Sequence, residues 1–161
     1  MKRIVIAAAF VTTCLSSGSL VAAVSHLPAE VRASLARSDE FWRFVAVSAI
    51  PDAVRVAFAA ETGEPFAMAE PGAEWQATDV VADEALPRRR LDMVATSKTH
   101  CFLFYELGGF TQSRHVAVFR LDEDGADLVW RAVRDASVRR PTDILRAIGR
   151  GALDDDPKYG F

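Results

Sequence analysis

The sequence predicts an α+β fold in which an antiparallel β-meander of about four to six strands carries helices from both ends of the chain. Two observations support this prediction. Three consecutive β-favouring runs, 100–107, 114–121 and 126–133, are joined by a short glycine-containing connection and by an Asp-Glu-Asp-Gly turn. Helical periodicity precedes them over 27–61 and returns after Pro141. We therefore expect N-terminal helices and a C-terminal helix packed on the sheet.

The first 23 residues have the features of a secretory signal peptide. Met1-Lys2-Arg3 is a positively charged start, 4–11 is apolar, and the stretch ends in the small residues Ala22-Ala23. We expect cleavage after Ala23 and export, so that a bacterial protein of this kind would be periplasmic, in the cell envelope, or secreted. The rest of the chain, 24–161, is then expected to form a single domain, and the cleaved protein should not be held at a membrane.

Two other interpretations of this N-terminal stretch stay open. One is a retained membrane anchor, because 4–24 contains no charged residue and about 20 apolar residues span a bilayer. Its several Ser, Thr and Gly residues make it a poor spanning helix. The other is lipid attachment at Cys14, although Thr13 is larger than the residue that normally precedes a lipidated cysteine. Either alternative would tie the protein to the membrane.

Length, charge and cysteine content exclude several classes of protein. Removing 23 of 161 residues leaves 138, and the loss of Lys2 and Arg3 takes the formal charge from −3 to −5. Such a chain is long enough for one domain with a core, and its negative charge argues against nucleic-acid binding. We interpret the arginine runs 88–90 and 139–140 as solvated loop charge. Cys101 is the only cysteine after the signal, so we expect a buried, inert thiol.

The N-terminal third is predicted to be helical. Pro28-Ala29-Glu30 suits a first helical turn, and 38–40 offers a cap for a second short helix over 41–45. The aromatic residues Phe41, Trp42 and Phe44 are expected to seal that helix onto the sheet, with a partner-binding anchor as the alternative. A further helix should begin at Pro51-Asp52 and end at Gly63.

The segment between this helix and the central strand has weaker signals. Residues 66–77 favour a hairpin with a Pro-Gly turn at 71–72. A strand is expected over 91–95, followed by a turn at 96–98. The chain then enters the run 100–107, whose two faces both carry large apolar side chains, so this strand should be central.

The turn at 122–125 suggests a register for the last two predicted strands. If Leu121 pairs with Ala126, then opposite charges and apolar side chains face each other across the strands. The expected cross-strand pairs are Arg120 with Asp127, Phe119 with Leu128, and Ala117 with Trp130. The chain should end with a helix that starts at Pro141 and stops at 149–151, followed by a polar tail from about residue 152.

Glu106 and His115 are the candidate catalytic residues. If Leu107 pairs with Arg114, then Glu106 lies opposite His115, and a carboxylate beside an imidazole is the minimum for acid–base chemistry. The carboxylate should raise the pKa of the histidine. This pair would suit a hydrolase, although a structural cross-strand pair is the simpler interpretation.

Other chemistry has no support in the sequence. The three histidines lack metal-ligand spacing, the acidic run 122–124 fits a β-turn better than a calcium loop, and there is no phosphate-binding glycine loop. No cofactor is predicted. We therefore favour an exported, non-catalytic binding module for a protein or a small ligand, with Phe110 and Arg114 as candidate contacts. The alternatives are the hydrolase and a structural envelope component or lipoprotein.

Overall fold

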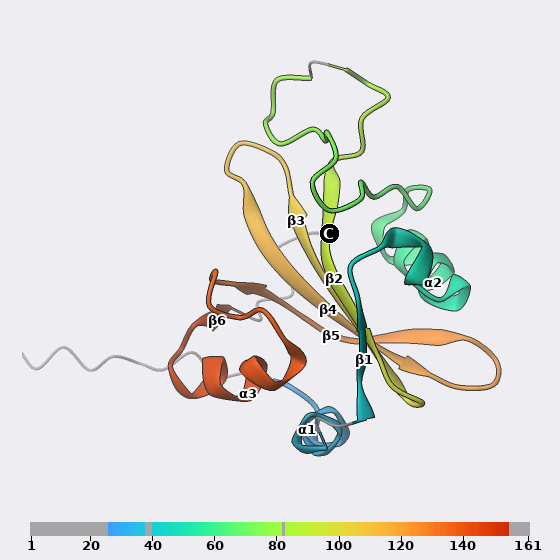
Figure 1. The fold of residues 1–161 in the computed structure, drawn as a ribbon, viewed down its shortest axis with the longest axis vertical. Helices are drawn as coiled ribbons and strands as arrows, with labels where there is room; N and C mark the ends of the chain where they lie inside the picture. The colour runs from blue at the N-terminus through green and yellow to red at the C-terminus, as the bar shows by residue number, and fades with distance from the viewer. Residues whose placement is uncertain (1–25, 38–39, 82, 155–161) are drawn as a thin grey trace, which may run out of the picture.

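The computed structural model describes residues 26–37, 40–81 and 83–154, which form a six-stranded antiparallel sheet with helices before and after it (Figure 1). Strands lie side by side in chain order, so the predicted α+β meander is confirmed. The predicted signal peptide and Cys14 lie outside the described residues. The elements are α1 (Ala29–Ala36), β1 (Trp42–Phe44), the 3-10 helix η2 (Val47–Ala49), α2 (Asp52–Thr62), β2 (Arg89–Thr96), β3 (His100–Leu107), β4 (Ser113–Leu121), β5 (Ala126–Arg134), α3 (Pro141–Gly149) and β6 (Leu153–Asp154).

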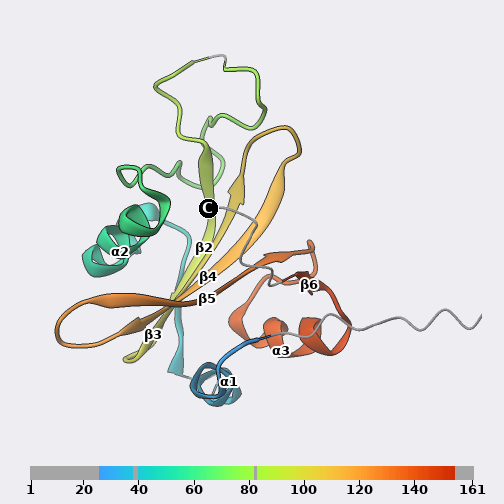
Figure 2. The same ribbon diagram turned by 180° about the vertical axis from the view of Figure 1, so that it is seen from behind.

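Helices cover both faces of the sheet (Figures 1 and 2). On one face, the α1/α3 face, both of those helices pack against a core that includes Phe102 and Phe104 of β3. On the opposite face, the α2 face, α2 packs against a core that includes Leu103 and Tyr105 of the same strand. Because its alternate side chains enter two cores, β3 is central, as predicted.

The ends of α2 and α3 agree with the predictions. α2 begins directly after Pro51 and ends at Gly63, whose φ of 69° is the left-handed conformation that glycine adopts without steric cost. Pro141 is the first residue of α3, where its missing N–H costs no helical hydrogen bond. Within the described residues, no helix has the length and apolar character needed to cross a bilayer.

The prediction of a helix over residues 41–45 is wrong, because this segment contains the edge strand β1. β1 pairs with β2 in antiparallel orientation, with Arg43 opposite Ala95. Phe41 packs edge-on against Phe102 at 5.1 Å between ring centroids, but Trp42 and Phe44 are 58% and 45% exposed. Pairing with β2 therefore determines the local structure here, and two of the three aromatic side chains do not seal a core.

The hairpin predicted over 66–77 is also absent, although its turn is present. The amide of Ala73 donates to the carbonyl of Glu70, and Gly72 has a φ of 81°. The segment before the turn pairs with β2 instead of with the segment after it, through a parallel bridge between Ala69 and Arg90. A long irregular connection, green in Figure 1, thus leads from α2 to β2.

The register between β4 and β5 follows the prediction near the turn and departs from it further along. Leu121 pairs with Ala126, Arg120 with Asp127, and Phe119 with Leu128. A β-bulge then follows, and Trp130 lies opposite Val118 instead of Ala117. One extra residue in β5, Val129, causes this shift. As a result Leu128 packs in the core under α2, whereas Trp130 packs in the core under α1 and α3.

The chain remains ordered beyond α3. Leu153 and Asp154 form β6, which pairs with the end of β5, and Leu153 is buried in the α1/α3 core. The polar tail predicted from about residue 152 therefore begins with a strand, and 155–161 lie outside the described residues.

Candidate functional site

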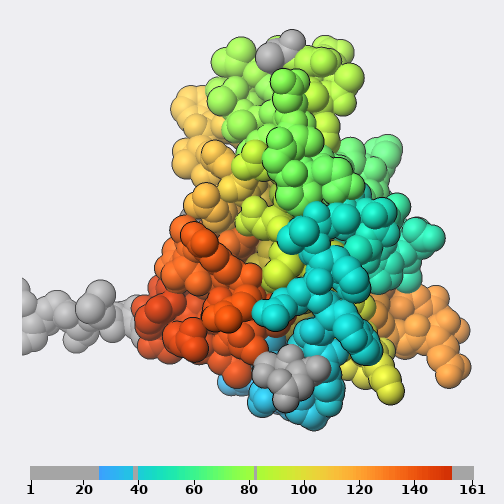
Figure 3. Space-filling model, in the orientation of Figure 1, coloured from blue at the N-terminus to red at the C-terminus, as the bar shows by residue number. Residues whose placement is uncertain are grey.

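A cleft of about 360 Å³ opens on the α1/α3 face, beside the segment that connects β5 to α3. In Figure 3 strands of the sheet are visible between this segment, in orange, and the cyan segment around β1. We call this site the arginine cleft, because three arginines contribute to its lining. The lining residues are Val45, Asp92, Met93, Phe104, Glu106, Arg114, Arg134, Ala136 and Arg139.

The structure does not bring Glu106 and His115 together. β3 pairs with β4 so that Glu106 lies opposite Arg114 and Tyr105 lies opposite His115, one residue away from the predicted register. A shift of one residue places the two candidate catalytic side chains on opposite faces of the sheet. Glu106 lines the arginine cleft, whereas the His115 ring stacks on Tyr105 at 5.2 Å between centroids.

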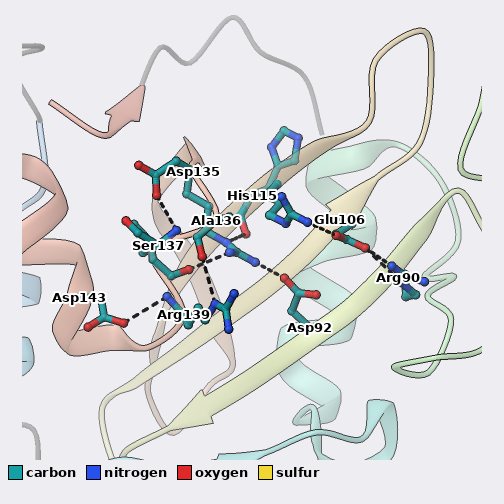
Figure 4. Close-up of polar contacts among 12 residues, drawn as sticks. Arg90, Asp92, Glu106, His115, Asp135, Ala136, Ser137, Arg139 and Asp143 are labelled. Atoms are coloured by element: carbon teal, nitrogen blue, oxygen red, sulfur yellow. Dashed lines mark hydrogen bonds and ion pairs between the residues drawn. The ribbon is translucent and has the colours of Figure 1, made fainter.

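Glu106 is the buried acceptor of two arginines. Only 4% of its side chain is exposed, and its Oε2 accepts hydrogen bonds from Nε and Nη2 of Arg90. Its other oxygen, Oε1, lies 3.2 Å from Nη2 of Arg114. Figure 4 shows Arg90 and Glu106 directed toward one another. The hydrogen bonds and opposite charges of the two arginines compensate for the hydration that this carboxylate loses on burial, and they hold it in one orientation.

Arg134 forms a second fixed charge at the end of β5. Its side chain is 2% exposed, and its Nη2 pairs with the carboxylate of Asp92. Nε donates to the carbonyl of His115 at 3.0 Å, and Nη1 donates to the carbonyl of Val138 at 2.7 Å. Burial lowers the pKa of this guanidinium, and the carboxylate of Asp92 opposes that effect. With three acceptors, Arg134 is held in one orientation.

Asp92 reaches Arg134 because it is the extra residue of a β-bulge. Leu91 pairs with Tyr105 and Met93 pairs with Phe104, so Asp92 has no partner across the strands. Leu91 enters the core under α2, and Met93 packs against the core on the other face. A bulge commonly redirects a side chain in this way at a functional site.

The arginine runs are not simply solvated loop charge. Arg89 and Arg90 belong to β2, and Arg89 is buried with its Nη1 3.1 Å from Glu64. Arg139 lines the cleft, and its Nε donates to the carbonyl of Ala136 at 3.1 Å (Figure 4). Arg140 contacts Asp143 at 3.2 Å. These arginines therefore have structural positions that composition alone did not reveal.

Asp143 holds the segment that forms one wall of the cleft. Its carboxylate accepts the amide N–H of Arg139 and contacts the guanidinium groups of Arg140 and Arg146. Burial raises the pKa of Asp143, but the hydrogen bonds from Arg140 and Arg139 outweigh that effect and keep the pKa below its usual value. The carboxylate also suits the positive N-terminal end of α3.

His115 lies in an environment that opposes protonation. Burial, and then the positive charges of Arg134, Arg131 and Arg89, lower its pKa to about 4. Its Nε2 lies 2.7 Å from the hydroxyl of Ser113. The expectation of a raised pKa is wrong, because the carboxylate that would raise it, Glu106, lies on the other face of the sheet.

Cys101 is fully buried, as predicted, and burial raises the pKa of its thiol to about 12. A thiol in this environment stays protonated and is a poor nucleophile or metal ligand. No group of three or more potential ligand side chains, from His, Cys, Asp or Glu, could hold a metal ion in the described part of the chain.

Phe110 lies outside the arginine cleft, in the connection between β3 and β4. Its side chain is 95% exposed, as expected of a candidate contact residue. The connection pairs with the segment before β2 through a bridge between Thr78 and Gly109. Of the two predicted contact residues, the structure therefore places Arg114 in the cleft and Phe110 in a separate loop.

Several residues of the cleft were missed by sequence reasoning, namely Asp92, Arg134 and Arg139. Asp92 interrupts the apolar run 91–95, a pattern that is compatible with a bulge. Arg134 ends a β-favouring run, a position that normally suggests exposure. No local signal distinguished Arg139 from the other arginines. Comparison with protein-family models, with curated proteins and with solved structures found no match to this chain.

Proposed function

We propose that the protein is an exported, non-catalytic binding module that holds a small ligand in the arginine cleft. The observation that carries the proposal is a cleft of about 360 Å³ whose floor contains two buried, oriented charges, Glu106 and Arg134. Small-ligand sites of this size combine apolar lining with a few positioned polar groups. Val45, Met93 and Phe104 supply the apolar part here.

Rigid positioning supports binding at this site. Ordered side chains lose little conformational freedom when a ligand arrives, so less of the interaction energy is spent on ordering them. Arg134 has three acceptors and Glu106 has two arginine partners, and both lie on strands of the central sheet. Sites on strands are more precise than sites on loops.

A variant whose cleft is filled by a large side chain tests the proposal. Ala136 is exposed and lines the cleft, so Ala136→Trp should fill the cleft without changing the core. Ala33→Trp, at an exposed position of α1, is the matched control. We expect ligand-observed NMR with a fragment library to detect fragments that bind the wild type and the Ala33→Trp variant but not the Ala136→Trp variant. Equal binding to all three proteins would reject the cleft as the binding site.

Export is tested separately by intact-mass measurement of the protein recovered from its producing cells. Cleavage after Ala23 gives a chain that begins at Val24. A lipid-bearing mass that begins at Cys14 would support a lipoprotein instead, and the full-length mass would contradict signal cleavage.

Phe110 supports a second candidate function, contact with a protein partner. Its aromatic side chain is 95% exposed on a connecting loop, the kind of segment that commonly carries contact residues. A photo-crosslinking amino acid at position 110 should capture a partner in the cell envelope, and the same group at Val56, which is 70% exposed on α2, is the control. Identical crosslinking patterns at the two positions would contradict the proposal that Phe110 contacts a specific protein partner.

A further inference from the structure

The arginine cleft contains more cations than carboxylates to neutralise them. The guanidinium groups of Arg114, Arg134 and Arg139 line it, together with only two carboxylates, those of Asp92 and Glu106. Glu106 is in addition shared with Arg90. A ligand that enters the cleft therefore meets an excess of positive charge.

Arg134 of the lining, and Arg90 behind Glu106, are already committed to groups of the protein. Arg134 donates to two backbone carbonyls and to Asp92. Arg90 donates through two nitrogens to Glu106, and its guanidinium lies 4.9 Å from the centroid of the Trp75 ring. Both side chains act as fixed structure and have little capacity left for a ligand.

Arg114 and Arg139 retain hydrogen-bond donors that face the cleft. Arg114 is 43% exposed and contacts Glu106 through Nη2 alone. Arg139 is exposed, and its guanidinium donates through Nε to a carbonyl of its own loop. Within the described part of the chain its guanidinium forms no ion pair. Since a guanidinium has five N–H donors, each of these two side chains has several available.

We infer that the ligand of the proposed function carries an oxyanionic group, a carboxylate or a phosphate, on an apolar skeleton. The inference rests on the proposed function and names the chemical class of its ligand. Arg114 and Arg139 hold the oxyanion, because planar guanidinium groups pair with carboxylate and phosphate oxygens through two parallel hydrogen bonds. The skeleton lies against the apolar part of the lining, which includes Val45 and Met93.

The free donors of the two arginines make the cleft selective for charged ligands. The carboxylate of Glu106 lies 3.2 Å from one nitrogen of Arg114, Nη2, and the other N–H groups of Arg114 can bind a ligand. A neutral ligand would leave the donors of Arg114 and Arg139 without a charged acceptor, so it loses the charge-assisted hydrogen bonds that an oxyanion gains. Discrimination between charged and neutral ligands of one shape therefore measures the role of these arginines.

Three probes of similar shape test the inference: benzoate, phenyl phosphate and the neutral benzamide. Their affinities are measured by NMR titration, with the guanidinium Nε–H signals of Arg114 and Arg139 as reporters. The variants are Arg114→Gln and Arg139→Gln. Arg32→Gln, at an exposed position of α1, is the matched control.

We expect saturable shifts of both reporter signals with at least one of the two anions, and a weaker interaction with benzamide. Loss of either cleft arginine should lower the affinity for the anion about tenfold, the effect typical of a hydrogen bond to a charged group. The Arg32→Gln variant should bind like the wild type. A preference for benzoate or for phenyl phosphate distinguishes a carboxylate ligand from a phosphate ligand.

Other outcomes overturn the inference. If benzamide binds as tightly as the anions, or if anion binding survives both cleft substitutions, the inference that the ligand carries an oxyanionic group is wrong. Failure of all three probes to bind at millimolar concentration would do the same. The proposed function is judged separately by the Ala136→Trp variant: fragments that this variant excludes keep the cleft as a binding site even when the anions fail.

Discussion

At Gly108 the end of β3 passes against the backbone of residue 76. A Cβ atom at this position would lie 1.8 Å from the carbonyl oxygen of Gln76 and 2.9 Å from its carbonyl carbon. Real Cβ atoms do not approach backbone atoms so closely, and a backbone cannot rotate away as a flexible side chain does. The requirement for glycine at position 108 is therefore steric, because only glycine permits this close approach to the backbone of Gln76.

Gly108→Ala should lower the free energy of unfolding by about 1 to 3 kcal/mol, the usual cost of overpacking. Urea denaturation followed by circular dichroism measures this change. Gly149→Ala is the control, because a Cβ at that position meets no atom within 4 Å and alanine favours the helix. An equal loss of stability in both variants would contradict the steric explanation.

His115 should make the protein less stable in mild acid. Its pKa of about 4 in the folded state lies below the 6.5 expected when it is exposed. Between these values the unfolded chain binds a proton that the folded chain excludes, so stability falls as the pH falls. Above pH 6.5 the imidazole is neutral in both states and this effect disappears.

His115→Gln should remove part of this pH dependence. Between pH 7 and pH 4.5 the free energy of unfolding of the variant should fall by roughly 2 kcal/mol less than that of the wild type. Urea denaturation at several pH values gives both curves, and their separation at pH 8 gives the packing effect of the substitution alone. Parallel curves over the whole range would show that His115 is not the titrating group.

The β-bulge in β2 connects the local structure of an element to the site. Asp92 is the unpaired residue of the bulge, and it is the carboxylate partner of buried Arg134. Removal of one member of a buried ion pair leaves the other charged and poorly solvated. Because 35% of the Asp92 side chain is exposed, water compensates for part of that loss.

Asp92→Ala should therefore lower the free energy of unfolding by about 2 kcal/mol, less than for a fully buried pair. Asp127→Ala is the matched control, because its ion pair with Arg120 has side chains that are 63% and 50% exposed. The free energy of unfolding of the Asp127→Ala variant should fall by less than about 0.5 kcal/mol. Thermal or urea unfolding of both variants measures the difference. Equal losses in the free energy of unfolding would mean that the ion pair with Asp92 does not stabilise buried Arg134 more than an exposed pair would.

The bulges also explain which parts of the elements could be predicted from sequence. The apolar side chains on both faces of 100–107 were sufficient to place β3 at the centre, and proline and glycine marked the ends of α2. The extra residue Asp92 interrupts the apolar run 91–95, a pattern compatible with a bulge, but the extra residue Val129 breaks alternation without a local sequence signal. β1 could not be predicted either, since a three-residue strand is determined by its partner.

The candidate site was less predictable than the fold, because its residues come from distant parts of the chain. Val45 follows β1, Arg114 belongs to β4, and Arg139 lies in the connection to α3. Only Glu106 and Arg114 could be selected from sequence, Glu106 as the partner of His115 and Arg114 as a candidate contact of a binding module. The register of β3 and β4, which the connection 108–112 does not specify, decided the outcome.

At the scale of the whole molecule, two cores share one sheet. Phe58 of α2 lies in one core and Ile144 of α3 lies in the other, and both side chains are almost fully buried. β3 contributes side chains to both cores, so loss of either core should destabilise the strand that supports the other. We therefore expect the domain to unfold in a single cooperative step.

Phe58→Ala and Ile144→Ala should each lower the free energy of unfolding by about 3 kcal/mol, the typical effect of such a cavity. Each substitution should shift the same transition, whether it is followed by far-ultraviolet circular dichroism or by tryptophan fluorescence. Two transitions, with each substitution shifting only one of them, would show that the cores unfold independently.

The order of the strands has a consequence for a chain that is still being synthesised. Each strand pairs with its neighbours in chain order, so β2, β3 and β4 can assemble as soon as each emerges from the ribosome. The α2 core also needs nothing beyond β5, but the wall of the arginine cleft and its contact with α3 belong to the last part of the chain. A polypeptide that ended at residue 134 would therefore have one complete core but would lack the wall of the arginine cleft that carries Ala136 and Arg139.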